Sequence, residues 1–171
     1  MDDMNPAWVP VAGIWVRHDR ADRDPIDPRS YGARWQTHAT RAVYLADSED
    51  TIWAEWYRGL AEGNQSPQAG LPRSLHRIAV NLERVADLTS ERARQALGLP
   101  RMRPSQSQWL AYQAFGEQLA AEGAQGVLYS SAARTRSRCL CVFSAGLSAL
   151  SVEGEPLRVL APPPPPHGLR T

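Results

Sequence analysis

The hydrophobic and polar positions along the chain predict a series of short strands and helices. Apolar, β-branched and aromatic runs at residues 9–17 and 42–46 are typical of strands. The segment between them is rich in Asp, Arg and Pro, a composition that cannot sustain a helix and indicates a surface loop. This loop leads to Arg34.

A helix is predicted directly after the second strand, because Ile52, Trp56 and Leu60 recur on one helical face. Polar residues at positions 47–50 supply capping oxygens and first-turn carboxylates, and Gly63 is a natural stop. Glu55 falls at the edge of the apolar stripe. From the pattern alone it is either a solvent-exposed flanking residue or part of a site beside the helix.

The rest of the pattern predicts one or two strands at 75–88, a short helix that ends at Gly98, a helix at 109–122, and strands at 126–131 and 139–143. This order has no regular strand–helix–strand repeat. It therefore favours an α+β fold, a single domain with antiparallel sheets flanked by helices, over a doubly wound sheet.

The end of the chain has a different composition. A run of prolines at 162–166 is followed by polar residues, and core-forming residues are scarce after residue 154. We therefore predict one domain at residues 1–154 and an exposed proline-rich tail at residues 155–171.

Composition and charge indicate a soluble globular protein. The chain has 171 residues, of which 43% are hydrophobic, and a formal net charge of +1, which gives no electrostatic basis for binding nucleic acid or a membrane. It shows no signal peptide and no membrane-spanning run, and no disulfide is expected between Cys139 and Cys141, so we expect a reduced, cytoplasmic protein. The histidines form no recurrent metal-ligand pattern, and no metal is expected.

Three residues have side chains suited to binding and cleaving a dinucleotide. Arg34 can bind a pyrophosphate bidentately, and Tyr44 can stack on a flat base. Glu55 can hold a ribose hydroxyl while opposing positive charge that develops on the sugar. Each residue taken alone has an ordinary structural explanation.

These residues lie in blocks that resemble the RES domain family, named for an Arg, a Glu and a Ser. Residues 32–35 are similar to its G-x-R-[WF] block, residues 42–46 to its "a-l-Y-l-s" strand, and Ala54-Glu55 to the "A-x-x-E" of its helix. Further on, similar segments match "l-D-L-T … l-G-l" at 85–99 and "G-i-x-Y-p-S-x-R" at 126–134. All blocks occur in the family's order.

Two positions depart from the family's pattern. The residue before the family serine is usually Pro but is Ser130 here, so the serine is assigned to Ser131 with Ser130 as the alternative. Arg134 follows one residue later than the usual spacing, which leaves its role open.

The resemblance implies a fold related to ADP-ribosyltransferase toxins, NAD as substrate, and membership of a bacterial toxin–antitoxin pair. Family members destroy NAD by hydrolysis or phosphorolysis, or transfer its ADP-ribose to a protein target. It also implies a cognate antitoxin with an Xre-like DNA-binding part, which covers the active site of the toxin in a hetero-oligomer.

The resemblance also assigns roles to residues. Glu55 is the expected catalytic residue, and Ser131 is expected to hydrogen-bond the nicotinamide amide or the ribose. Arg34 and Arg17 are expected at the phosphates and Tyr44 near the nicotinamide, whereas Arg17 is equally explained as a surface arginine. Trp35 and Trp53 are expected in the core.

Three functions remain open at this point. The chain is an enzyme that consumes NAD with water or phosphate as acceptor, a transferase that modifies a protein, or an interaction domain with a decayed site. The joint presence of Arg34, Tyr44, Glu55 and Ser131 argues against the decayed site.

Overall fold

A computed structural model describes residues 5–103 and 106–170, so residues 1–4 of the predicted domain and residue 171 of the predicted tail lie outside it. The strands are β1 (Ala7–Arg20), β2 (Ala42–Ala46), β3 (Arg73–Leu88), β4 (Gly126–Ser130), β5 (Arg138–Phe143) and β6 (Leu150–Val159). The helices are α1 (Glu49–Glu62), α2 (Glu91–Ala96) and α3 (Trp109–Ala121). None of the helices in these ranges combines the length and hydropathy that a bilayer span requires.

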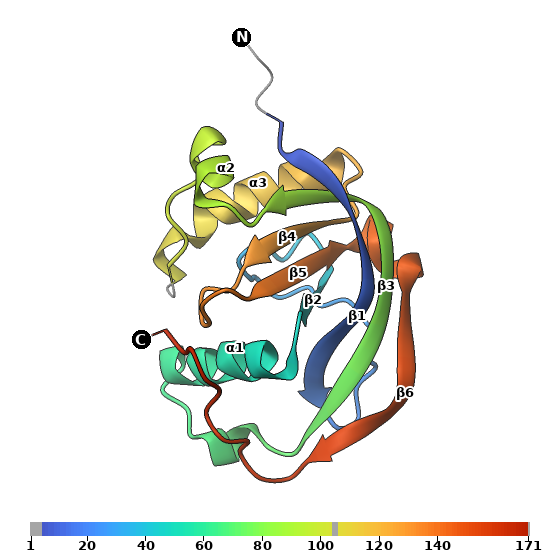
Figure 1. The fold of residues 1–171 in the computed structure, drawn as a ribbon, viewed down its shortest axis with the longest axis vertical. Coiled ribbons are helices and arrows are strands. Elements are labelled where there is room, and N and C mark those ends of the chain that lie inside the picture. Colours follow the sequence, from blue (N-terminus) through green and yellow to red (C-terminus); the bar gives the residue numbers. More distant parts are fainter. Residues whose placement is uncertain (1–4, 104–105, 171) are drawn as a thin grey trace.

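The strands form one mixed sheet that closes on itself. β1 and β3 are long antiparallel strands that pair along most of their length, and β6 lies on the other edge of β3 (Figure 1). The order continues from the end of β3 through β4, β5 and β2, and a bridge between Ala46 and Val16 joins β2 back to β1. The α+β prediction is confirmed.

One strand pair departs from the predicted antiparallel pairing. β3 and β4 run parallel, with Val85 opposite Gly126 and Leu88 opposite Tyr129. The chain between them contains α2 and α3. Parallel neighbours need a crossover of this kind, because a tight turn always reverses the strand direction.

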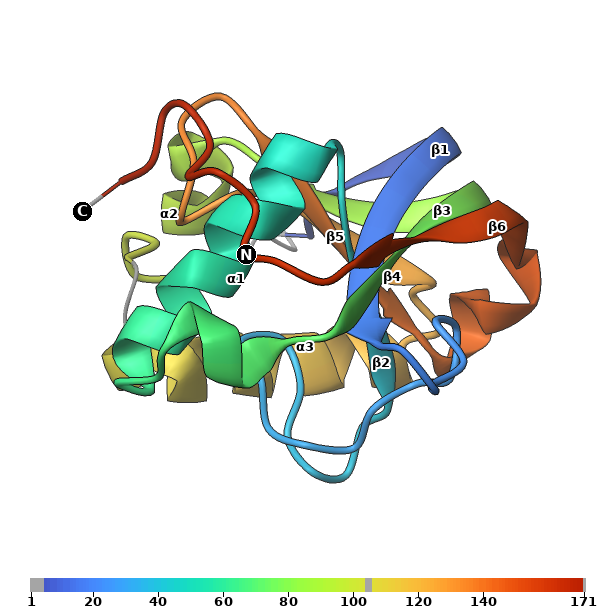
Figure 2. The same cartoon turned by 90° about the horizontal axis from the view of Figure 1, so that it is seen from below.

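The period-two alternation of β5 separates two parts of the core. Leu140 and Val142 pack inside the ring of strands, whereas Cys139, Cys141 and Phe143 face the opposite side, together with buried residues of α3. The helices lie on this second side of β2, β4 and β5. On the other side of these three strands, across the interior of the ring, lie β1, β3 and β6 (Figure 1, Figure 2). Trp35 and Trp53 are both buried, which confirms their prediction as core residues.

Helix α1 follows the sequence prediction closely. The Ser48 side chain caps its first turn by accepting from the Thr51 amide at 3.3 Å, and Gly63 ends it. Its apolar stripe packs with Trp53 against the ends of β1 and β3. Glu55 lies at the edge of that stripe and is half-buried.

Helix α3 holds the loop that carries Arg34. The Gln113 side chain donates to the Ala33 carbonyl at 2.9 Å, and the Glu117 carboxylate accepts from the Thr37 amide at 2.9 Å. A Cβ added at Gly116 would lie only 2.0 Å from the Trp35 carbonyl oxygen. A glycine at this position therefore lets the loop backbone lie directly against the helix.

The chain after Phe143 differs from the sequence prediction. The predicted boundary between residues 154 and 155 falls inside β6, a strand that the pattern did not indicate. Beyond β6, Pro166 is buried and the Tyr57 hydroxyl donates to the Pro163 carbonyl of the proline run. The segment thus lies along α1 and the β4–β5 connection (Figure 1, Figure 2).

Candidate active site

A pocket of about 320 Å³ opens between α1, the start of α3 and the loop before β2, and Arg34, Tyr44 and Glu55 all line it. The three residues come from a loop, a strand and a helix, so the fold brings together side chains that are separated along the chain. Pocket-lining residues that the sequence analysis missed are Tyr31, Arg58, Trp109 and Tyr129.

The two oxygens of the Glu55 carboxylate have different surroundings. Oε1 accepts from the Ser131 hydroxyl at 2.6 Å, from the Ala133 amide at 3.4 Å and from the Cys139 thiol at 3.7 Å. Oε2 lies 4.0 Å from Nη1 of Arg58 and belongs to a side chain that is 30% exposed. Oε1 is therefore held by three protein donors, whereas Oε2 has only the more distant Arg58 guanidinium as its partner among the described residues.

Ser131 and Ser130 have different partners, because successive residues of a strand end point to opposite sides. The Ser131 hydroxyl is buried, donates to Glu55, and accepts from the Ala133 and Arg134 amides at 3.1 and 3.0 Å. The Ser130 hydroxyl instead donates to the Thr89 carbonyl at 2.6 Å. The geometry places Ser131 beside the candidate catalytic carboxylate and directs Ser130 away from it.

Arg34 is a buried guanidinium, 8% exposed, at the edge of the pocket. Its Nη2 donates to the Arg103 carbonyl at 2.9 Å, and its Cζ lies 5.5 Å from the centroid of the Tyr112 ring. Its Nη1 has no hydrogen-bond partner among the described residues. A buried donor of this kind is costly unless an acceptor reaches it, which suits an anionic ligand.

Tyr44 lines the pocket with its ring while its hydroxyl is bound inside the protein. The hydroxyl accepts from the Trp35 amide at 3.2 Å. Burial, together with the Cys141 thiol beside it, raises the pKa of the Tyr44 phenol well above its usual value. The hydroxyl is therefore fixed by the loop backbone, and the phenol stays protonated.

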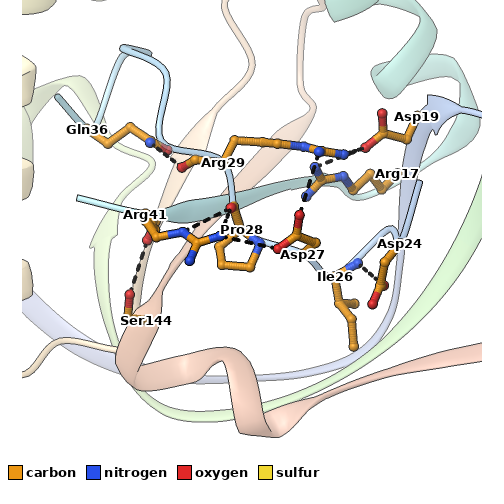
Figure 3. A network of polar contacts seen from close by, with 10 residues as sticks. All are labelled: Arg17, Asp19, Asp24, Ile26, Asp27, Pro28, Arg29, Gln36, Arg41 and Ser144. Atoms are coloured by element: carbon orange, nitrogen blue, oxygen red, sulfur yellow. Dashed lines mark hydrogen bonds and ion pairs between the residues drawn. The ribbon is translucent and has the colours of Figure 1, made fainter. Parts of the chain in front are cut away.

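Arg17 lies in a second pocket, of about 270 Å³, that shares Tyr31 and Tyr44 with the first. Figure 3 shows Arg17 and Arg29 converging on Asp19, with Arg17 at 3.3 Å. Nη1 of Arg17 is buried and has no acceptor within the part of the chain that the structure describes. The fold thus places Arg17 next to the first pocket but in a separate, strongly basic recess.

Arg58 shows why part of the site escaped sequence analysis. It lies one turn after Glu55 on α1, with its side chain 12% exposed and its Nη2 hydrogen-bonded to Glu62. A helical Glu–Arg spacing is common on solvent-exposed faces, and the sequence pattern does not show that this arginine side chain is largely covered. As for metals, residues 5–103 and 106–170 contain no cluster of three His, Cys, Asp or Glu side chains.

Comparison with known proteins shows which family and which solved structure the chain resembles. A family model described as "RES domain" matches residues 11–160. A chain in the crystal structure of the M. tuberculosis MbcT–MbcA toxin–antitoxin complex has a similar fold, with a TM-score of 0.77 and 25% sequence identity over 89% of this chain and 86% of that chain. No curated protein matches the sequence.

Proposed function

Since the chain belongs to the RES domain family, we propose that it is the toxin of a toxin–antitoxin pair and an enzyme that cleaves the nicotinamide–ribose bond of NAD. Water or phosphate is the proposed acceptor, so that the reaction depletes NAD. The site supports this proposal through one observation above all. The Glu55 carboxylate is oriented by Ser131 inside a pocket that also contains the buried Arg34 guanidinium.

The pocket residues fit a dinucleotide. The Nη1 of Arg34, which has no partner among residues 5–103 and 106–170, is the proposed charge-assisted donor to a phosphate oxygen, and the Tyr44 ring is the proposed stacking surface. The first pocket lies at the small end of the range for ligand sites, about 300–1,000 Å³. The second pocket, which contains Arg17, shares Tyr31 and Tyr44 with it and extends the space available to a two-part ligand.

Glu55 is the proposed catalytic residue. Loss of nicotinamide leaves positive charge on the ribose, and a carboxylate placed beside the sugar stabilises that charge. Because Oε1 is bound by Ser131 and Ala133, Oε2 is the oxygen we assign to the substrate. Ser131 then acts mainly by fixing the carboxylate, since its single proton is already donated to Glu55.

We also propose an antitoxin as partner. The similar fold comes from a toxin–antitoxin complex. An antitoxin that covers the pocket would block NAD, and co-purification of the chain with the product of a neighbouring gene, with loss of NAD turnover in the complex, tests this proposal.

The activity is tested by incubating the purified chain with NAD labelled in the adenosine part, alone and in lysate. Release of nicotinamide without labelled protein is expected. A labelled protein band would instead indicate transfer of ADP-ribose to a protein target. Binding of NAD without any turnover would contradict the enzymatic proposal.

Glu55→Ala should lower NAD turnover about 100- to 1,000-fold, as the loss of one electrostatic stabiliser of a transition state does in other enzymes. The fold should persist, because Glu55 lies at the margin of the apolar stripe of α1. Glu49→Ala, which removes an exposed carboxylate from the same helix, is the matched control and should turn over NAD like the parent. Equal activity of Glu55→Ala and the parent would remove Glu55 from the chemistry.

A further inference from the structure

The connection between β4 and β5 carries Ser131 and is bound to the start of α1, the helix that carries Glu55. The Asp47 carboxylate accepts from the Arg138 amide at 2.8 Å, and the Asp47 amide donates to the Arg138 carbonyl at 3.1 Å. The hydrogen bond between Glu55 and Ser131 therefore joins two elements whose adjoining residues, Asp47 before α1 and Arg138 at the start of β5, are also bound to each other.

Arg134 lies in this connection and binds both elements. Its backbone amide donates to the Ser131 hydroxyl at 3.0 Å. Its guanidinium reaches the first turn of α1, with Nη2 at 2.9 Å from the Asp50 carboxylate and Nη1 at 3.3 Å from the Thr51 hydroxyl. Nη1 also donates to the Ser137 hydroxyl at 3.0 Å, so that two residues of the β4–β5 connection are bound to each other.

The chain end binds the third guanidinium nitrogen of Arg134. Nε donates to the His167 carbonyl at 2.9 Å. Beside it, the Thr135 amide donates to the Gly168 carbonyl at 3.1 Å, and the Arg170 amide donates to the Ala133 carbonyl at 2.8 Å. We call residues 167–170 the strap, and Figure 2 shows this last, dark red part of the chain passing beside the β4–β5 connection.

The backbone of Ala133 links the strap to the candidate catalytic carboxylate through its amide and its carbonyl. Its carbonyl accepts from Arg170, while the Ala133 amide points to Oε1 of Glu55 at 3.4 Å. Neighbouring Ala132 lines the pocket. The backbone at Ala133 is therefore bound both by the strap and by the Glu55 carboxylate.

We propose that Arg134 is a positioning residue for Glu55, and that the strap holds Arg134 and the β4–β5 connection in the conformation that orients the carboxylate. This proposal rests on the proposed function only for its predicted effect on the kcat of NAD turnover. Arg134 lies outside the pocket and binds other parts of the protein with all three guanidinium nitrogens. Its role is thus exerted through Glu55 and Ser131.

The first test compares Arg134→Ala and Arg134→Lys in the full chain. Arg134→Ala should lower kcat for NAD about 10- to 100-fold, the size of effect that misplacing a catalytic group produces, with KM within about twofold. Arg134→Lys should recover part of kcat, because an ammonium can still pair with Asp50 but cannot also reach His167 and Ser137. Unchanged kcat, or a change confined to KM, would overturn the proposal.

The second test uses the strap and does not depend on a substitution at Arg134. Arg170→Pro removes the amide that binds the Ala133 carbonyl. Arg170→Ala is its matched control, since it keeps that amide and removes only the exposed side chain with its long 3.5 Å contact to the Thr135 hydroxyl. Arg170→Pro should lower kcat in the same sense as Arg134→Ala, and Arg170→Ala should not. If the two Arg170 variants were equally active, the strap would have no part in positioning Glu55.

Amide hydrogen exchange separates a failure of this proposal from a failure of the proposed function. The Arg134 and Thr135 amides should exchange faster in Arg170→Pro than in Arg170→Ala, whether or not the parent turns over NAD. A parent chain without NAD turnover would refute the proposed function while exchange still reports on the strap. If both amides were equally protected in the two variants, the proposed role of the strap would be refuted.

Discussion

At the scale of single residues, the hydroxyl of Ser131 is the group whose role changes most once its neighbours are known. The sequence resemblance implies a contact with the nicotinamide amide or the ribose. In the structure the hydroxyl donates to Glu55 and accepts from the Ala133 and Arg134 amides. A hydroxyl with these three bonds is better suited to orienting a carboxylate than to binding a substrate.

Arg34→Ala should weaken NAD binding by about 1.5 to 3 kcal/mol, the usual contribution of a hydrogen bond to a charged group. The reason is that its buried Nη1 lacks a partner within the described chain and belongs to a residue that lines the pocket. Calorimetry with NAD measures the change, and Arg77→Ala, which removes an exposed arginine from β3, is the control for net charge. The same affinity in Arg34→Ala and the control would exclude Arg34 from the site.

At the scale of elements, the contact between α3 and the loop before β2 decides where Arg34 lies. The contact depends on a glycine, because the Trp35 carbonyl occupies the space where a Cβ of residue 116 would be. Buried Trp35 and the hydrogen bonds of Gln113 and Glu117 complete it. A methyl group at this point has to push the loop away from the helix.

Gly116→Ala should therefore destabilise the protein by about 1 to 3 kcal/mol, as overpacking of a tight contact does. Gly59→Ala is the matched control, because Gly59 is also helical but an added Cβ meets no described atom within 4 Å. That control should be neutral or gain about 0.5 to 1 kcal/mol from helix propensity. Urea unfolding of both variants checks the prediction. Equal stability of the two would show that the loop moves away from the helix with no loss of stability.

Strand β6 illustrates an element that a single sequence does not reveal. Its residues are exposed almost throughout, with Leu150 as its buried residue, so it has neither an apolar run nor an alternating apolar face. It forms because the first half of β3 offers a free edge of backbone donors and acceptors. Hydrogen bonds to a strand that is far away in the sequence do not affect the local hydrophobic pattern.

At the scale of the whole molecule, His18 lies where β1, α1 and β3 meet. Its ring stacks on Trp53 with centroids 5.0 Å apart, and its Nδ1 accepts from Nε of Arg73 at 2.9 Å. Burial, and then the positive charge of Arg73, lower the pKa of His18 to about 3. The imidazole is therefore neutral in the folded protein.

Acid should destabilise the protein through this histidine. The unfolded chain binds a proton at His18 near pH 6.5 and the folded protein does not, so stability falls by about 1.4 kcal/mol per pH unit between about pH 6 and pH 3. Burial also lowers the pKa of His76, which acts in the same direction. Urea unfolding at pH 7 and pH 5 measures how much stability is lost on acidification. This loss should be smaller for His18→Phe, which keeps an aromatic ring beside Trp53, than for the parent. An equal loss of stability in both proteins would show that groups other than His18 cause the acid sensitivity.

The sequence by itself determined the local elements and the family. The bounds of β2, the capped start of α1 and the stop at Gly63 follow from short-range patterns, because a cap or an apolar stripe depends on residues within a few positions. The same short blocks indicated Arg34, Tyr44 and Glu55, which the fold brings to one pocket.

Only the tertiary structure decided how these elements are joined. The parallel pairing of β3 with β4, the choice of Ser131 over Ser130 beside Glu55, the separate recess of Arg17 and the contacts of the chain end all depend on residues far apart in sequence. Their physical cause is the pairing of buried backbone and side-chain polar groups across the fold. Such partners become neighbours only after the chain has folded.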